Sequence, residues 1–366
     1  KCWQSSITGW SGTKMEGPYE YVAPDYWYFD KNAGGAFGFN TETGIGANLP
    51  QLESLRRMIP EASLWPLSAD WDYHCTASSS VMNNTKVLSN AIEKLYGAPA
   101  DLEDFVRKAH AVDYNGTRAM FESFRVRMPL STGIVQWMLN SAWPSLYWQL
   151  YDWYGVPTAA YYGVKKACEP EQLIYNYGDR KVYAVSEKPE GRELVAWARL
   201  FDDKGGLIME TSRPVQLDYR SVVPVFDLRR FAVIPRYVFL FLTEKDGTPV
   251  ADNFYALGTK DNEYVFEKTT WYDTPISSWT DLHFVFAKAF PEIEVTMEPA
   301  EGGYSVKVRN PLDGVVAQVI LKAYDADGNL AVPVFWSDNF FALQPNETRT
   351  VFCKTDLKDL DICVKN

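Results

Sequence analysis

Histidine is scarce in this chain. Three occur among 366 residues, at His74, His110 and His283, far apart in the sequence. Histidine-based triads and histidine-rich metal sites both need imidazoles that can be brought together, so neither is expected. Cysteine is also sparse and odd in number: the five are Cys2, Cys75, Cys168, Cys353 and Cys363. Their wide spacing predicts free or buried thiols rather than a disulfide framework or a zinc knuckle.

The chain also lacks an excess of basic charge and long apolar runs. The chain has 36 Lys and Arg against 47 Asp and Glu, a net charge of -11. An acidic chain without a basic stripe repels nucleic acid, so no nucleic-acid partner is expected. The apolar run at residues 238–242 is too short to span a membrane and predicts a buried strand. Residues 1–6 show no charged-then-apolar leader, so no signal peptide is visible, as would also hold for a mature or trimmed start.

The absence that bears most on function is that of a second well-placed carboxylate. Hydrolysis of sugar linkages usually needs two acids, and this chain offers one good candidate, Glu42. Glu42 lies within residues 34–44, where Phe37 and Phe39 alternate with Gly38 and further glycines stand on both sides. This pattern predicts a strand that delivers a carboxylate to the rim of a pocket. An ordinary exposed glutamate in a loop is the alternative, and the periodicity alone does not decide between them.

A second predicted strand, at residues 134–140, also ends in polar and aromatic side chains. Trp137 offers a flat face for stacking on a sugar ring, and Asn140 offers an amide for binding a hydroxyl. Core packing is the alternative for Trp137, and more so for Trp143. Aromatic residues make up 15% of the chain, with 13 Trp and 22 Tyr, which by itself is more typical of cores than of a ligand site.

The sequence pattern changes near residue 170. Before this point, strand-like runs alternate with helical ones, which is typical of parallel α/β structure. Helices are predicted over residues 52–58, 86–96, 144–154 and 157–167, and from an Asp101 cap to Arg107 or beyond. After it, short alternating strands are separated by turn signals at residues 177–179, 202–205, 245–247 and 326–329, which predicts β-sandwiches.

A short internal repeat divides the β-rich half. Residues 252–257 match residues 338–343 at an offset of 86, about the length of one immunoglobulin-like sandwich. We therefore expect two related modules that meet at residues 288–291, and three domains in all: residues 1–169, 170–288 and 289–366. Each copy of the repeat begins with an Asp-Asn pair, interpreted as a polar turn into a strand rather than a metal motif. The first domain has too few units to close an eight-unit barrel of about 250 residues, so the chain is predicted to begin inside a barrel.

The two strand segments together resemble a known family. Residues 34–43 and 136–145 are similar to glycoside hydrolase family 2, in the branch of the exo-β-D-glucosaminidases and mannosylglycoprotein endo-β-mannosidases. Residues 14–22, 160–167 and 336–339 resemble the same branch, so the similarity runs over essentially the whole chain. It implies a multidomain protein, α/β followed by all-β: part of a TIM (β/α)8 barrel, then two immunoglobulin-like β-sandwiches.

The resemblance also implies a reaction. Glu42 matches the family nucleophile at the end of the seventh barrel strand, whereas the acid/base at the end of the fourth strand has no counterpart in this chain. Retaining hydrolysis is implied, with the two carboxyls about 5–5.5 Å apart and no metal or other cofactor. Because the family's acid comes from elsewhere, Glu16, Glu20 and Asp25 are poor choices for the second acid.

Substrate contacts are expected from several side chains near the two strand ends. These are Asn40, Trp137, Asn140, Trp143, Glu16 and Tyr19, with Trp27 as a further active-site loop residue. The favoured activity is that of an exo-β-D-glucosaminidase on an oligosaccharide or glycan. The alternatives are a β-mannosidase or endo-β-mannosidase of the same family and a non-catalytic carbohydrate-binding protein. The N-terminal portion of the same enzyme is the expected partner, residues 170–366 are expected to buttress the barrel, and the expected location is periplasmic or secreted.

Overall fold

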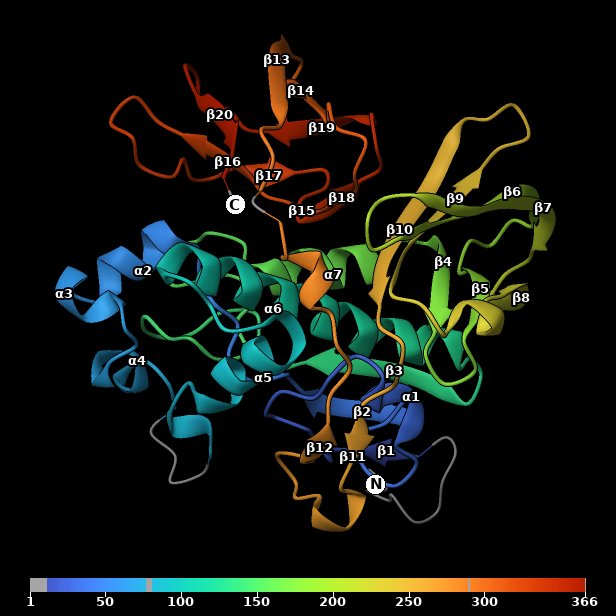
Figure 1. Cartoon of the computed structure of the whole chain (residues 1–366), viewed down its shortest axis with the longest axis horizontal. Helices are drawn as coiled ribbons and strands as arrows, with labels where there is room; N and C mark the ends of the chain where they lie inside the picture. Colours follow the sequence, from blue (N-terminus) through green and yellow to red (C-terminus); the bar gives the residue numbers. More distant parts are fainter. Residues whose placement is uncertain (1–11, 77–80, 289, 366) are drawn as a thin grey trace.

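The structure is a computed structural model that describes residues 12–76, 81–288 and 290–365. It is mixed α and β, and its last α-helix ends at Ala167, close to the predicted change of pattern near residue 170. Figure 1 shows the helices in the middle of the molecule, one β-rich part to the right and another above. The N-terminal strands lie below the helices in the same view.

Three parallel strands form the sheet that carries Glu42. They are β1 (Thr13–Lys14), β2 (Gly38–Thr43) and β3 (Ser131–Gln136), with β2 in the centre. Gly38 has a φ of +60°, and a Cβ there would lie 2.3 Å from the backbone oxygen of Gly12. Only glycine lets β2 begin this close to the preceding chain. The strand predicted to deliver Glu42 is therefore confirmed.

The segment after β3 differs from the predictions. Because β3 ends at Gln136, the strand predicted over residues 134–140 is wrong at its end, and residues 144–154 form no helix. The backbone of this stretch pairs with distant segments instead: Met138 N donates to Trp148 O, and further hydrogen bonds join it to the loop after β2. These long-range bonds satisfy the polar backbone groups that a helix would have paired locally.

The other predicted helices are confirmed. They are α2 (Leu52–Met58), α5 (Lys86–Tyr96), α6 (Leu102–Val126) and α7 (Ala159–Ala167), accompanied by the short α1 (Tyr26–Phe29), α3 (Glu61–Leu64) and α4 (Ala69–Tyr73). Asp101 caps α6 as predicted, because its Oδ1 accepts a hydrogen bond from Asp104 N at 2.8 Å. α6 is buried along most of its length, since α5 and α7 pack against it.

Two antiparallel sheets follow and pack face to face. One has the order β4 (Glu171–Asn176), β5 (Lys181–Ser186), β8 (Ser221–Asp227); the other has the order β10 (Pro249–Leu257), β9 (Arg236–Thr243), β6 (Arg192–Asp202), β7 (Leu207–Leu217). Apolar side chains from both sheets form one buried cluster between them. The turn signals at residues 177–179, 202–205 and 245–247 connect consecutive strands, and β9 contains the predicted buried strand at residues 238–242.

The last part of the chain forms further antiparallel sheets. Strands β13 (Glu294–Ala300), β14 (Gly303–Arg309), β19 (Thr348–Lys354) and β17 (Phe335–Trp336) form one; β15 (Val316–Val319) pairs with β18 (Phe341–Leu343), and β16 (Leu321–Tyr324) with β20 (Asp361–Val364). They surround a second apolar cluster, which Tyr114 of α6 and Tyr162 of α7 join. This part is therefore packed directly on the helices.

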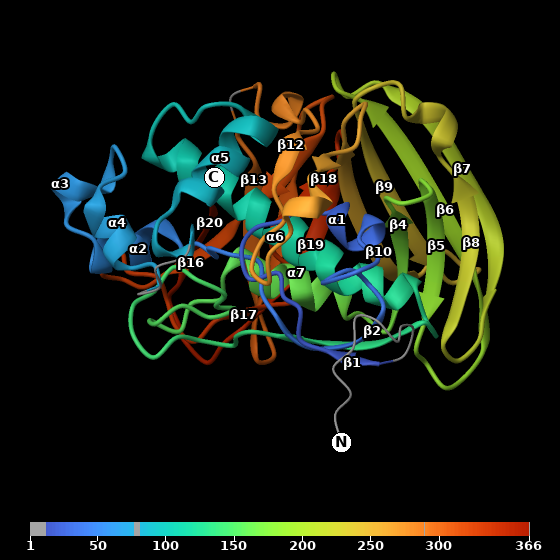
Figure 2. The same cartoon turned by 90° about the horizontal axis from the view of Figure 1, so that it is seen from below.

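Between these two β-rich parts, residues 258–287 form an arm that includes β11 (Glu263–Tyr264) and β12 (Ile276–Ser278). Figure 2 shows the arm on the face turned toward the viewer, over α5 and α1. Asn262 N donates to Asp25 Oδ2 at 2.8 Å, and Tyr19 N donates to Tyr272 O at 2.9 Å. These bonds fix the arm to the loop that follows β1.

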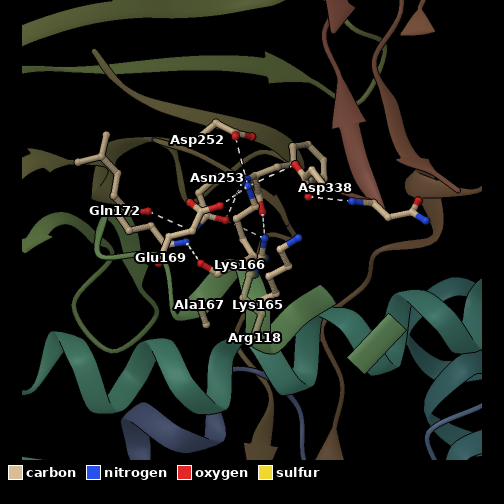
Figure 3. A network of polar contacts seen from close by, with 12 residues as sticks. Arg118, Lys165, Lys166, Ala167, Glu169, Gln172, Asp252, Asn253 and Asp338 are labelled. Atoms are coloured by element: carbon tan, nitrogen blue, oxygen red, sulfur yellow. Dashed lines mark hydrogen bonds and ion pairs between the residues drawn. The ribbon is translucent and has the colours of Figure 1, made fainter. Parts of the chain in front are cut away.

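A cluster of charged residues, here called the junction cluster, joins the helices to both β-rich parts (Figure 3). Lys166 of α7 lies 3.0 Å from Glu169, 3.2 Å from Asp252 and 3.3 Å from Asp338, measured from Nζ to carboxylate oxygen. Arg349 of β19 binds the same two aspartates at 3.0 and 3.1 Å. The two repeated aspartates therefore meet in space. Because Asp252 lies inside β10, the interpretation of its Asp-Asn pair as a turn is wrong.

The remaining sequence predictions concern thiols, boundaries and membrane spans. Cys75, Cys168, Cys353 and Cys363 are free thiols as predicted, and Cys2 lies outside the described residues. Residue 289, within the predicted boundary at residues 288–291, lies outside them too. Within the described ranges, no helix combines the length and the apolar character that crossing a membrane requires.

Candidate active site

Glu42 lies near the C-terminal end of β2, partly exposed, where functional side chains gather in parallel sheets. The Tyr19 hydroxyl donates a hydrogen bond to Glu42 Oε1 at 2.8 Å. Tyr19 is 7% exposed, and burial, followed by the bond to the carboxylate, raises the pKa of Tyr19 well above its ordinary value. The phenol therefore stays protonated at neutral pH and remains a donor to the carboxylate.

Asn40 positions Glu42 from two residues before it on β2. It is fully buried, and its Oδ1 accepts a hydrogen bond from Glu42 N at 3.3 Å. Its Nδ2 donates to Gly17 O at 3.2 Å, and Thr43 Oγ1 donates to Pro18 O at 2.8 Å. The end of β2 is thus tied to the loop that carries Tyr19. Both the oxygen and the nitrogen of the Asn40 amide therefore bond to backbone groups of the protein. Because the side chain is fully buried, these bonds occupy the amide that is predicted to bind substrate.

Trp137 lies beside the end of β2, because its backbone N donates to Thr43 O at 2.8 Å. Its side chain is 43% exposed. Gln136 Nε2 donates to the backbone oxygens of Trp137 and Trp148, both at 2.9 Å, and so fixes two tryptophan segments at once. An exposed indole next to the strand of Glu42 suits stacking on a sugar ring, and the role of Trp137 as a substrate contact stays a prediction.

Two further tryptophans contact Tyr19, and no local sequence pattern predicted either of them. Trp148 Nε1 donates to Tyr19 O at 2.7 Å, and the two rings meet edge to face at 6.3 Å between centroids. Trp271, from the arm, meets the Tyr19 ring at 5.5 Å. Both are far from Tyr19 in the chain, so the high aromatic content was the one sequence feature that agrees with their presence at the site.

The other predicted aromatic and amide contacts lie in different surroundings. Trp143 stacks on His74 with ring centroids 5.5 Å apart, and it is 38% exposed. Asn140 is exposed, and its Nδ2 donates to Ser141 O at 3.3 Å. Trp27 is fully buried in α1, so the prediction that it is an active-site loop residue is wrong. Its large apolar ring is core.

Three acids lie in the loop that carries Tyr19, between β1 and α1. Glu16 lies partly exposed after β1. Glu20 and Asp25 are buried and bonded within the protein: Glu20 accepts from the Tyr147 hydroxyl at 3.1 Å, and Asp25 from Asn262 N at 2.8 Å. A general acid must come within hydrogen-bond reach of its substrate, and carboxyls enclosed in this way do not.

The Glu20→Gln substitution is expected to change how stability depends on pH. Burial raises the pKa of Glu20 from 4.5 to about 7 in the folded protein. Between these pH values the folded state holds a proton that the unfolded state releases, so this group costs stability as the pH rises. The variant lacks that cost. Its free energy of unfolding should exceed that of the parent by on the order of 3 kcal/mol near pH 8 and by little near pH 4. Urea unfolding across this range measures the difference, and a constant difference would contradict the assignment.

Known proteins resemble this chain along nearly its whole length. A family described as "Exo-beta-D-glucosaminidase Ig-fold domain" matches residues 271–364. The exo-β-D-glucosaminidase of Streptomyces avermitilis is 36% identical over 95% of this chain and 40% of its own length. The mannosylglycoprotein endo-β-mannosidase of Lilium longiflorum is 28% identical over 70% of this chain and 28% of its own. The chain thus spans about 40% of the length of the exo-β-D-glucosaminidase that it matches.

Solved structures agree with the sequence comparison. The crystal structure of the Amycolatopsis orientalis exo-chitosanase CsxA superposes with a TM-score of 0.88 at 32% identity, covering 100% of this chain and 46% of that one. The β-D-mannosidase of Dictyoglomus thermophilum shares the fold, with a TM-score of 0.71 at 16% identity over 94% of this chain and 39% of its own. The resemblance stated from the motifs is confirmed: nearly the whole chain is similar to exo-β-D-glucosaminidases, with mannosidases among its further relatives.

Proposed function

We propose that the full-length protein containing this chain is a retaining β-glycoside hydrolase that releases glucosamine, with Glu42 as its nucleophile. The observation that carries the proposal is the hydrogen bond from Tyr19 to Glu42 at the C-terminal end of the central parallel strand. Relatives named exo-β-D-glucosaminidase that match 95% of the chain support the choice of sugar. The hydrolytic reaction itself needs neither metal nor organic cofactor.

The reaction would proceed through a covalent intermediate. One carboxylate oxygen of Glu42 attacks the anomeric carbon while a second acid protonates the departing oxygen, and the glycosyl–enzyme ester is then hydrolysed by water. Tyr19 holds Oε1 of Glu42 and so directs the other oxygen toward the sugar. Because Tyr19 stays protonated, it can also stabilise Glu42 when the carboxylate leaves the sugar again.

The second acid is proposed to come from a preceding part of the same protein. Residues 1–169 are taken as the later units of a TIM barrel, followed by immunoglobulin-like sandwiches at residues 170–288 and 289–366. Among the described residues, the outer strands β1 and β3 of the parallel sheet each pair with β2 alone, and Val135 of β3 is 46% exposed. A barrel has no open edge, so further strands of an N-terminal portion would pair with β1 and β3.

A β-mannosidase or endo-β-mannosidase is the second candidate. It is favoured by the relative of Lilium longiflorum, although that match covers less of this chain. The sugars differ at carbon 2, where glucosamine carries an ammonium group and mannose an axial hydroxyl. Comparison of aryl β-glucosaminide and aryl β-mannoside as substrates of the full-length protein separates the two. A periplasmic or secreted location would suit an enzyme that meets polymeric glycans.

The isolated 366-residue chain is expected to lack turnover. It contains the nucleophile without its acid, and loss of general acid catalysis alone typically costs about 10²–10⁴-fold in rate. The test compares release of the aryl group by equal concentrations of this chain and the full-length protein. Addition of the separately expressed N-terminal portion is the control for a folded chain. Robust turnover by the isolated chain would contradict a missing catalytic partner.

A further inference from the structure

The arm at residues 258–287 holds one aromatic side chain at the rim of the candidate active site. Its root is anchored by Asp25, whose carboxylate accepts hydrogen bonds from Asn262 N at 2.8 Å and from Asn262 Nδ2 at 3.0 Å. The C-terminal end of the arm is anchored by Leu282 N, which donates a hydrogen bond to Leu95 O of α5 at 2.9 Å. The segment between these anchors is thus held at both ends.

The tip of the arm is itself fixed. Thr270 N donates to Asp273 O at 2.9 Å, and the Thr270 hydroxyl donates to Asp273 Oδ1 at 2.5 Å, which closes a tight turn. Tyr272 O accepts hydrogen bonds from Tyr19 N at 2.9 Å and from Glu20 N at 2.7 Å. The turn is therefore bound, through backbone groups, to the loop whose tyrosine holds Glu42.

Trp271 lies in this turn and is more exposed than Trp137, Trp143 and Trp153. Its side chain is 61% exposed although the backbone around it is bonded on both sides. A Cβ at Gly17, which has a φ of +68°, would lie 2.4 Å from Trp271 O, so the loop and the arm touch directly. An apolar ring of this size gains stability by burial, and the fold instead keeps it in solvent.

The position of the indole relative to Glu42 defines what it can bind. Trp271 contacts the ring of Tyr19 edge to face at 5.5 Å between centroids, and the Tyr19 hydroxyl donates a hydrogen bond to the carboxylate of Glu42. One side chain thus separates the indole from the carboxylate of Glu42. The sugar that reacts must touch Glu42 itself, so the indole is placed for the neighbouring sugar.

We propose that Trp271 is a stacking platform for the glucosamine unit next to the one that reacts. The apolar face of a pyranose ring packs on indole, and an ammonium group is attracted to the indole face as well. This inference rests on the proposed function of the Glu42 site. The platform comes from the segment where the match to the exo-β-D-glucosaminidase Ig-fold family begins, so the β-rich half takes part in substrate selection.

The test uses the full-length protein with two substitutions that keep the apolar bulk against Tyr19. Trp271→Leu removes the aromatic face, whereas Trp271→Phe retains one. The KM for a glucosamine tetramer should rise roughly tenfold in the leucine variant and clearly less in the phenylalanine variant, with kcat changed less than about twofold. The inhibition constant of free glucosamine, which fills only the reacting position, should be unchanged in both. Trp153→Leu, at another exposed tryptophan, is the matched control.

The outcomes separate this inference from the proposed function. One outcome is that Glu42→Gln abolishes hydrolysis while the KM for the tetramer is the same in the parent, Trp271→Leu and Trp271→Phe. The assignment of Trp271 as a stacking platform is then wrong, and the assignment of Glu42 as the nucleophile is kept. If Glu42→Gln retains full activity, the proposed function fails first. If Trp271→Leu raises the inhibition constant of free glucosamine as much as the KM of the tetramer, the indole acts on the reacting sugar or on the fold. The assignment to the neighbouring unit is then overturned. Far-ultraviolet circular dichroism establishes folding of each variant.

Discussion

Replacing Glu42 by Gln in the full-length protein is expected to lower kcat for β-glucosaminide hydrolysis on the order of 10⁴-fold or more. The amide is nearly the same size as the carboxylate, and its oxygen can still accept the hydrogen bond from Tyr19. It cannot form the glycosyl–enzyme ester, so the loss falls on the chemical step while the KM stays within a few-fold. Initial rates on an aryl β-glucosaminide, with binding measured separately by calorimetry, give both quantities.

Two companion variants make this result specific. Tyr19→Phe removes the hydroxyl that holds Glu42 Oε1 and should lower kcat by roughly 10–100-fold, since it weakens orientation without removing the nucleophile. Glu298→Gln changes an exposed carboxylate on β13 in the same way as Glu42→Gln, and it should leave the rate unchanged. Hydrolysis by Glu42→Gln at more than a tenth of the parental rate would exclude Glu42 as the nucleophile.

The second large effect is expected at the junction cluster. Lys166→Met should lower the free energy of unfolding by about 3 kcal/mol, because it leaves the partly buried Asp252 and Asp338 with one of their two cations and removes the cation beside Glu169. The Lys166 side chain is 6% exposed. Burial alone would lower the pKa of Lys166, but the carboxylates of Asp252, Asp338 and Glu169 raise it well above its ordinary value. The lysine is therefore charged at neutral pH, and urea unfolding there measures its full contribution.

The neighbouring lysine supplies the matched control. Lys165 lies on the same helix, is more exposed, and donates to Trp336 O at 2.6 Å. Lys165→Met removes one hydrogen bond to a backbone oxygen and should cost less than about 1.5 kcal/mol. Combining Lys166→Met with Asp338→Asn should cost less than the sum of the two single changes, since both act on one ion pair. Equal losses for the two lysine variants would contradict a special role for the cluster.

Local signals predicted the helices and the strand of Glu42 because these elements depend on nearby residues. The spacing of apolar side chains placed α2 and α5 to the residue, and the Asp101 cap placed the start of α6. Residues 144–154 had a similar period, yet their backbone pairs with segments far along the chain. No pattern within the stretch distinguishes these two outcomes, because the competing hydrogen bonds lie outside it.

Within the site, the sequence predicted where Glu42 lies but did not predict which tryptophans are exposed beside it. The pattern around Glu42 predicted its strand and its place at the strand end. Trp27 and Trp137 belong to the same residue type, but the first is fully buried and the second is 43% exposed, a difference set by packing with distant elements. Trp148 and Trp271 were missed because each reaches Tyr19 from a far part of the chain. The repeat was visible, whereas the meeting of its two aspartates was not.

The bond between the Tyr19 loop and the arm also sets an order of events during synthesis. Tyr272 leaves the ribosome long after Tyr19, and Tyr272 O is the acceptor for the backbone amides of both Tyr19 and Glu20. Domains generally fold as units as they emerge, and contacts between distant residues form late. The helices and the parallel sheet can thus assemble while the loop beside Glu42 still lacks its support. Until the arm has emerged, the loop beside Glu42 in a nascent chain lacks these two backbone hydrogen bonds, so under the proposed function activity would be gained only late in translation.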